Sequence, residues 1–137
     1  MIPFNVPPCV GEEIEYVKQA IASHKICGDG AFTKQCNAWL EERFHAQKVL
    51  LTTSGTTALD MAMLLCDLQP GDEVILPSFT FSSTATSAVL AGARLVFVDI
   101  RPDTMNIDET KIEQAITDRT KAVSYTHLRA HETEADL

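Results

Sequence analysis

The chain has 137 residues, of which 45% are hydrophobic and 22% are charged, the composition of one modest globular domain. Its 19 acidic and 11 basic residues give a net charge of −8 without any lysine and arginine cluster, which argues against nucleic acid and membrane surfaces as partners. The amino terminus has no signal-peptide pattern, no apolar run is long enough for a membrane span, and the four cysteines lack CxxC or metal-ligand spacing. We therefore expect a cytoplasmic protein with free thiols and no metal site.

Two amphipathic helices are predicted in the first third of the chain. Prolines make residues 1–10 an extended arm. Helical spacing of apolar residues predicts a helix over Glu12–Ser23 and a second one that opens at Phe32 or Thr33. Trp39 lies on the apolar face of the second helix, and we expect it in the core rather than in a ligand site.

The stretch from Lys48 to Asp67, KVLLTTSGTTALDMAMLLCD, organises the rest of the chain. Its start, Lys48–Leu51, is short, apolar and predicted to be a buried strand. Thr52–Thr57 is a turn of hydroxyl residues with one glycine. Ala58–Cys66 is apolar almost all round and is predicted to be a helix buried in the core.

This order of strand, small turn and buried helix is suited to holding an anion. The first turn of a helix leaves backbone N–H groups without partners, and the helix dipole adds positive potential there. Gly55 has no Cβ, so a phosphate can approach the backbone, and Thr56 and Thr57 offer hydroxyl donors. Alternatively, Ser54 or Thr56 only caps the helix. The turn lacks a P-loop or GxGxxG motif, so the residues alone leave both readings open.

Strands and helices alternate through the remainder of the chain after a Pro-Gly turn at residues 69–72. In chain order we predict a strand at Glu73–Leu76, a helix at Ser82–Leu90 closed by Gly92, a strand at Arg94–Asp99, a helix at Glu109–Ile116 with Ile116 among its inward-facing residues, and the start of a strand at Ala122. Such alternation indicates an α/β fold with about four parallel strands and helices on both faces. Ligands of such sheets bind at the carboxyl ends of the strands, which here are Thr52–Thr57, Pro77–Ser83 and Asp99–Pro102.

Three motifs, TTSGTTALDMA, QPGDEVILPSFTFSSTA and GARLVFVDIRPDTMNID, occur in this order. Together they resemble the DegT/DnrJ/EryC1/StrS family of sugar aminotransferases that use pyridoxal 5'-phosphate, over about residues 1–123. The resemblance implies the aspartate aminotransferase-like fold (fold type I), of which residues 1–123 form the N-terminal arm and the first part of the large domain. The opening, IPFNVPP and then CGDGAFTKQCNAWLEERF, resembles in particular the members that make dTDP-4-amino-4,6-dideoxygalactose for enterobacterial common antigen, a surface polysaccharide.

The resemblance also implies a site and a reaction. Gly55, Thr56 and Thr57 hold the cofactor phosphate, and Phe81 stacks on the pyridine ring, although the residues alone favour core packing for Phe81. An amino group passes from glutamate to the 4-keto carbon of a dTDP-linked 6-deoxyhexose, in a homodimer with shared sites. The family's Schiff-base lysine and the aspartate that pairs with the pyridinium nitrogen come from a later part of the chain. The lysines here do not sit in that motif: Lys18, Lys25, Lys34, Lys48, Lys111 and Lys121.

The last residues, 124–137, depart from the family pattern. They read SYTHLRAHETEADL, without an apolar face that can complete a buried strand, so we expect a disordered or non-native tail. The string YTHLRAHE resembles translated sequencing-adapter sequence, and a frameshift is the alternative. His127 and His131 have the spacing of a zinc pair but no third ligand. On this interpretation the chain alone is inactive; the competing hypotheses are a complete non-catalytic phosphate- or nucleotide-binding α/β module and a nonfunctional truncation product.

Overall fold

The computed structural model describes residues 5–125. The chain divides into two units between residues 51 and 52, and each is described by itself. Residues 124 and 125 carry no regular secondary structure, and the remainder of the predicted tail, with its two histidines, lies outside the described residues. No helix among the described residues is long and apolar enough to cross a membrane.

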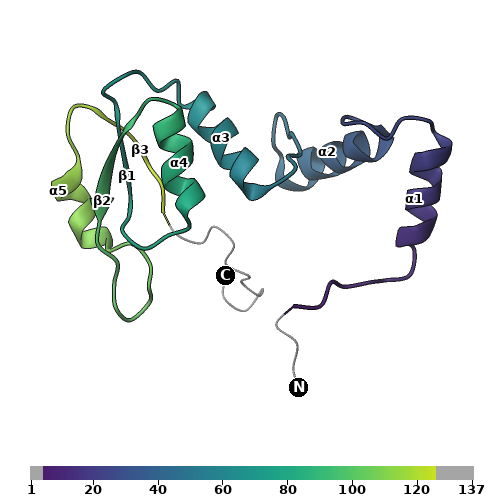
Figure 1. Cartoon of the computed structure of the whole chain (residues 1–137), viewed down its shortest axis with the longest axis horizontal. Coiled ribbons are helices and arrows are strands. Elements are labelled where there is room, and N and C mark those ends of the chain that lie inside the picture. The colour runs from purple at the N-terminus through teal and green to yellow at the C-terminus, as the bar shows by residue number, and fades with distance from the viewer. Residues whose placement is uncertain (1–4, 126–137) are drawn as a thin grey trace. The chain divides into compact units, whose positions relative to one another are not determined.

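The first unit contains two helices, α1 (Glu13–Ala22) and α2 (Ala31–Phe44), which confirms both predicted helices (Figure 1). The Glu13 carboxylate accepts hydrogen bonds from the N–H groups of Val10 and Gly11 at 2.6 and 2.9 Å and so covers the start of α1. None of the described residues of this unit is buried. Trp39 is 60% exposed, so its predicted place in the core is wrong: two helices alone supply no second layer to cover it.

Lys48–Leu51 is not a strand, contrary to the prediction. A strand is defined by a hydrogen-bonded neighbour, and this segment pairs with none of the described strands. It is held instead by Glu41, whose carboxylate accepts from the Val49 N–H at 3.0 Å and pairs with the Lys48 ammonium at 3.0 Å. Its β propensity has no described partner to act on.

The second unit is built on a parallel sheet in the order β2-β1-β3, which confirms the α/β prediction with three described strands instead of about four. The strands are β1 (Glu73–Pro77), β2 (Arg94–Val98) and β3 (Thr120–Val123). Every residue of β1 is buried, as expected for a central parallel strand covered on both faces. The turn before β1 has Gly71 at φ +97°, with the Asp72 N–H donating to the Gln69 carbonyl at 2.9 Å.

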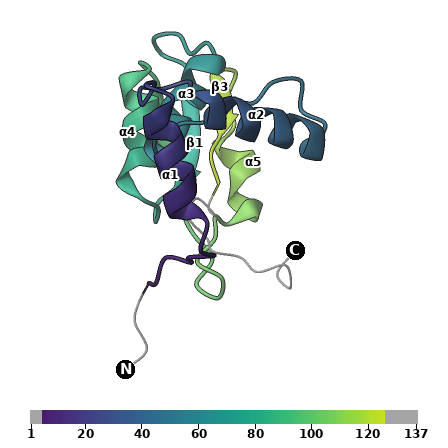
Figure 2. The same cartoon turned by 90° about the vertical axis from the view of Figure 1, so that its right-hand side faces the viewer.

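Each face of the sheet has its own small core. On one face Val74 packs with residues of α3 (Gly55–Leu65) and with Ala88 of α4 (Ser82–Leu90). On the other face Ile75 packs with Ile107 and with α5 (Ile112–Ala115), which continues from a short 3₁₀ turn, η1 (Glu109–Lys111). Figure 2 shows α4 and α5 on opposite sides of the strands. Helices on both faces were predicted, and their arrangement confirms it.

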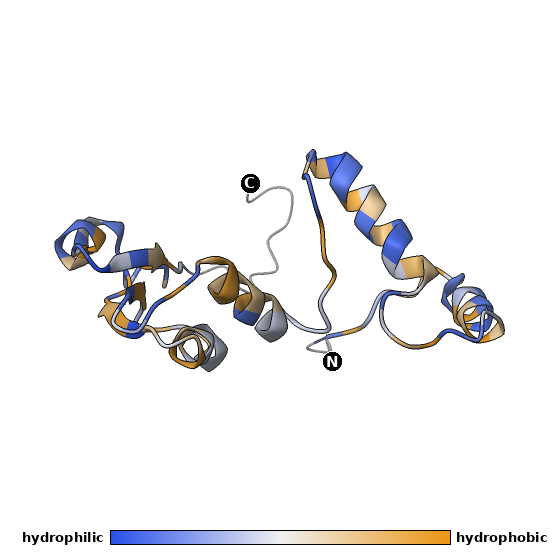
Figure 3. Ribbon diagram, turned by 90° about the horizontal axis from the view of Figure 1, so that it is seen from above, coloured by the Kyte–Doolittle hydropathy of each residue, from blue (hydrophilic) through white to orange (hydrophobic). Residues whose placement is uncertain are grey.

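Two details of the predicted packing are wrong. Ile116 was expected to face inward but is 54% exposed, because α5 ends at Ala115 and the backbone of Ile116 turns extended. Helix α3 was expected to be buried all round and is largely orange in Figure 3, yet only Leu59 and Met63 are buried, whereas Leu64 and Leu65 are 74% and 81% exposed. Within the described residues, α3 has a covering partner on one face only.

Candidate functional site

The N-terminus of α3 is capped by Ser54. The Ser54 side chain accepts a hydrogen bond from the Thr57 N–H at 3.1 Å, and the two hydroxyl oxygens lie 3.0 Å apart. The Thr57 hydroxyl also lies 3.4 Å from that of Thr53. The sequence left Ser54 and Thr56 open as the capping residue, and the structure assigns the cap to Ser54. The Thr57 hydroxyl is thereby drawn into a chain of hydroxyl groups around the first turn.

The cap leaves the groups predicted to bind an anion accessible. Within residues 5–125, no backbone or side-chain acceptor bonds the N–H of Gly55 or Thr56. A Cβ built on Gly55 would meet no atom within 4 Å, so the space beside this backbone is open. The φ of Gly55 is not in the left-handed region, so neither backbone strain nor protein packing requires a glycine here. Within the described residues, the open space leaves room for a ligand to approach this backbone.

Phe81 lies where the second part of the predicted site begins. It is the residue before α4, its backbone is extended with φ −69° and ψ 140°, and the residue is 50% exposed. The hydroxyls of Thr80 and Thr84 lie 3.3 Å apart beside it. Because β1 ends at Pro77 and α4 starts at Ser82, Phe81 stands at the carboxyl end of the central strand. A half-exposed aromatic ring at this edge offers a flat apolar face to a ligand.

The two helices that carry these parts pack side by side (Figure 1). Met63 of α3 and Ala88 of α4 belong to the same core cluster. A polar link joins them as well, since the Ser87 hydroxyl donates to the Asp60 carboxylate at 2.5 Å. Gly55, Thr56 and Thr57 therefore form the first turn of one helix, and Phe81 immediately precedes the helix packed against it.

The third predicted loop, at the carboxyl end of β2, is closed by a backbone bridge and by ion pairs. Ile100 and Ile107 form an antiparallel bridge, and the Arg101 guanidinium donates to Asp103 at 2.8 Å and to Glu109 at 2.9 Å. The hydrogen bonds from Arg101 hold the pKa of the Asp103 carboxyl below its usual range. These charges are satisfied between the loop and η1, so the ion pairs have a structural role.

Lys111 of η1 forms further ion pairs with residues at the two ends of the same loop. Its ammonium pairs with Asp99 at 3.0 Å and with Asp108 at 3.5 Å, and the hydrogen bond to Asp99 raises the pKa of the lysine. A lysine held as a cation by two carboxylates is unsuited to nucleophilic attack.

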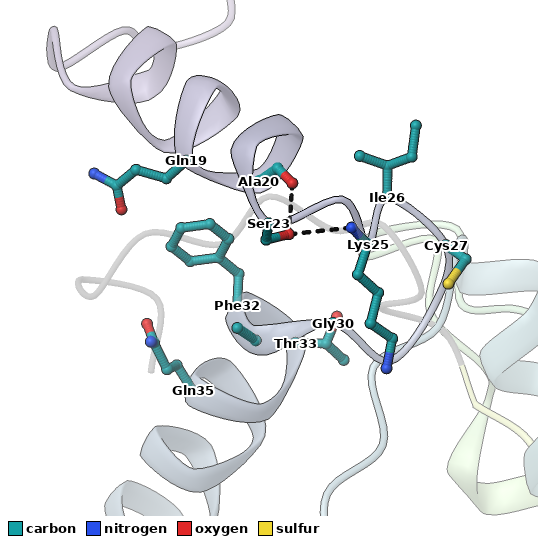
Figure 4. A pocket seen from close by; sticks show the side chains of 11 residues that line it. Gln19, Ala20, Ser23, Lys25, Ile26, Cys27, Gly30, Phe32, Thr33 and Gln35 are labelled. Atoms are coloured by element: carbon teal, nitrogen blue, oxygen red, sulfur yellow. Dashed lines mark hydrogen bonds between the residues drawn. The ribbon is translucent and has the colours of Figure 1, made fainter.

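A cavity of about 440 Å³ lies in the first unit, between α1 and α2 (Figure 4). Phe32 lines it, and the Lys25 ammonium beside it donates to the Asp29 carbonyl at 3.2 Å. It contains none of the predicted site residues. No sequence pattern predicted this cavity.

Comparison with known proteins decides the family. The model of the DegT/DnrJ/EryC1/StrS aminotransferase family matches residues 8–136. The chain belongs to this family.

Curated members of the family resemble the chain over nearly its whole length. GDP-perosamine synthase of Escherichia coli O157:H7 is 34% identical over 130 residues, which cover 95% of this chain and 36% of that protein. The dTDP-4-dehydro-2,3,6-trideoxy-D-glucose 4-aminotransferase of Saccharopolyspora spinosa is 36% identical over 129 residues, which cover 93% of this chain and 33% of that protein. The chain spans about a third of the length of these relatives.

Solved structures of relatives share the fold. NtdA of Bacillus subtilis, solved with bound PMP, the amino form of the cofactor, matches with a TM-score of 0.78 and 34% identity over 88% of this chain and 28% of that chain. The GDP-4-keto-6-deoxy-D-mannose-3-dehydratase of E. coli, solved with hydrated PLP, matches with a TM-score of 0.73 and 29% identity over 90% of this chain and 33% of that chain. The described part of the chain therefore has the fold of PLP-dependent sugar aminotransferases, as the sequence predicted.

The residues fit the phosphate and the ring of such a cofactor. Two unbonded N–H groups at a helix N-terminus suit a phosphate, and the open space at Gly55 is a place that a side chain would fill. Phe81 supplies an aromatic surface for a pyridine ring.

Proposed function

We propose that this chain is the cofactor-phosphate part of a PLP-dependent aminotransferase that acts on a sugar nucleotide. In this proposal the N–H groups of Gly55 and Thr56 bind the phosphate, the Thr57 hydroxyl turns from Ser54 toward it, and Phe81 stacks on the ring. The observation that carries the proposal is the capped N-terminus of α3, where the N–H groups of Gly55 and Thr56 have no acceptor within residues 5–125 and open space lies beside Gly55. When bound, the cofactor acts as an electron sink for the bond broken at the amino-bearing carbon.

The protein's own groups have separate tasks in this proposal. The helix dipole and the two N–H groups of α3 hold the phosphate dianion without needing a lysine there. The ring of Phe81 fixes the plane of the pyridine and excludes water from one of its faces. The residues that bind the amino donor and handle protons are assigned to the portion of the enzyme that the relatives have and these 137 residues do not cover.

We assign the substrates by class. The amino donor proposed is glutamate, in line with a relative named 3-oxo-glucose-6-phosphate:glutamate aminotransferase from Bacillus subtilis, 40% identical over 99 residues. The acceptor proposed is a dTDP-linked 4-keto-6-deoxyhexose, for the aminosugar of a surface polysaccharide such as enterobacterial common antigen. Relatives are named for GDP sugars as well as dTDP sugars, so the GDP-linked ketosugar is the competing acceptor.

The proposal includes the setting of the enzyme. We place it in the cytoplasm, in keeping with the four exposed free cysteines. We also propose a homodimer or larger homo-oligomer for the complete enzyme, as the resemblance to the family implies. We interpret residues 1–123 as the arm and first part of the large domain and residues 124–137 as a non-family tail.

A non-catalytic phosphate- or nucleotide-binding module is the second candidate. It is favoured by one observation: the capped turn and the open space beside Gly55 at the N-terminus of α3 both lie within the described residues. Under this hypothesis the chain binds phosphate compounds without preferring a pyridine ring.

Two experiments test these proposals. The first is equilibrium dialysis of the 137-residue chain against pyridoxamine 5'-phosphate, pyridoxamine and a sugar phosphate. Pyridoxamine has the ring without the phosphate and the sugar phosphate has the phosphate without the ring, so the comparison separates cofactor recognition from general phosphate binding. Tighter binding of pyridoxamine 5'-phosphate than of both others supports the enzyme proposal, and equal binding of all phosphates supports the module.

The second experiment sequences the source DNA from the codon for Thr120 onward. If the frame continues to an aspartate and a lysine in the family's motif, the longer protein is expressed and assayed with glutamate and either the dTDP- or the GDP-linked 4-keto-6-deoxyhexose. Amino transfer to neither acceptor contradicts the proposed reaction. We expect the 137 residues alone to transfer no amino group, because none of their lysines sits in that motif.

A further inference from the structure

Helix α3 carries one charged side chain, Asp60, which lies beyond the two threonines of the first turn among apolar residues. Its carboxylate accepts from the hydroxyl of Ser87, a residue of α4 that is only 2% exposed. Among the described residues, no other hydrogen bond between a side chain of α3 and a side chain of α4 is observed. A hydroxyl that donates to an ionised carboxylate makes a short, directional bond.

The rest of the contact between the two helices is less specific. It rests on apolar packing such as that of Met63 with Ala88. Apolar burial is non-directional, so it favours close packing without selecting one position along the helix axis. The hydrogen bond between Asp60 and Ser87 adds that selection.

The positions of the two residues match. Asp60 is five residues after Gly55, the first residue of α3, and Ser87 is five residues after Ser82, the first residue of α4. Five residues correspond to about 7.5 Å of helix axis. The bond therefore ties equivalent points of the two helices, whose N-terminal ends lie toward the same side of the sheet (Figure 1). A slip by one turn moves one end by about 5.4 Å relative to the other.

We propose that Asp60 is a positioning residue, which through Ser87 holds the phosphate-binding turn of α3 and the aromatic residue before α4 in register for one ligand. This inference rests on the proposed function, because it assumes that Gly55–Thr57 and Phe81 bind two parts of the same molecule. Asp60 itself touches neither part. Its contribution is the fixed offset between them.

The test compares two ligands on the 137-residue chain, with folding of each variant checked by circular dichroism. Inorganic phosphate uses the N-terminus of α3 alone, whereas pyridoxamine 5'-phosphate uses both helices. Ser87→Ala removes the donor, and we expect it to weaken pyridoxamine 5'-phosphate about tenfold while phosphate affinity stays within about twofold. Asp60→Asn keeps an acceptor oxygen, so it is expected to retain most of the affinity for both ligands.

Thr86→Ala is the matched control. Thr86 is exposed on α4 and its hydroxyl donates to the Ser82 carbonyl of its own helix at 3.0 Å, so its loss leaves the link to α3 intact. We expect both affinities of this variant to equal those of the unaltered chain.

The outcomes separate the inference from the proposed function. Equal losses for both ligands in Ser87→Ala indicate a purely structural role and overturn the inference, and so does unchanged affinity for pyridoxamine 5'-phosphate. If the unaltered chain binds phosphate no more weakly than pyridoxamine 5'-phosphate, the proposed ring contact fails and the inference falls with it. If it binds neither, the proposed phosphate site fails first.

Discussion

Replacing Gly55 by alanine separates the stability of α3 from its capacity to bind an anion. The added Cβ meets no atom within 4 Å and the backbone is not in a glycine-specific region, so the fold accepts it without strain. A strain-free glycine-to-alanine change stabilises a protein by about 0.4–1 kcal/mol, mainly because the unfolded chain loses freedom. The same methyl group occupies the space in which the phosphate would lie. Loss of one hydrogen bond to a charged group costs about 1.5–3 kcal/mol, so we expect phosphate affinity to fall roughly ten- to hundredfold.

Two measurements on the same variant check this prediction. Urea unfolding gives the free energy of unfolding, and phosphorus NMR titration gives the affinity for inorganic phosphate. Gly28→Ala is the control, because this glycine also has open space around it and an ordinary φ but lies outside the site. A folded Gly55→Ala variant that binds phosphate within about twofold of the unaltered chain refutes the proposed phosphate site at the N-terminus of α3.

Three further predictions concern stability. Ile75→Ala removes a side chain with 0% exposure from the central strand and is expected to cost about 2–5 kcal/mol in urea unfolding, whereas Leu64→Ala, at 74% exposure, stays within about 0.5 kcal/mol. Ser54→Ala removes the cap of α3 and is expected to lower the free energy of unfolding by about 1 kcal/mol; an unchanged value contradicts the capping role. The pKa of Asp103 is lowered by Arg101 from its ordinary 3.8, so its contribution to stability is present above 3.8 and is lost as the pH falls through the lower folded value. An NMR titration of that carboxyl with its midpoint at or above 3.8 contradicts the ion pair.

Local signals explain the parts of the fold that the sequence predicted. The Pro-Gly turn at residues 69–72 and the glycine after α4 act within a few residues of themselves. Gly92 has φ +89°, its N–H donates to Val89, and the next N–H donates from Ala93 to Ala88 at 3.0 Å, a Schellman motif that stops the helix where the sequence indicated. These boundaries need no knowledge of the rest of the molecule.

Partners far away in the sequence explain the parts that failed. Lys48–Leu51 has strand propensity but no described neighbour, and Trp39 has the apolar register of a core residue but nothing described that covers it. At the candidate site, the capped, hydroxyl-rich turn before α3 was predictable from its residue types. The link from Asp60 to Ser87 was not, because the one charged residue of α3 gives no indication of its partner 27 residues later.

The place of β1 between its two neighbours sets an order of events on the ribosome. Strand β2, which follows β1 after the single helix α4 and ends at residue 98, covers one edge of this fully buried strand. The other edge is covered only by β3, residues 120–123, which is synthesised later. A nascent chain paused between these points exposes an open strand edge, which is a template for aggregation. Chaperone demand during translation should therefore peak over the segment that contains the ion-paired loop and α5, and ease when β3 leaves the exit tunnel.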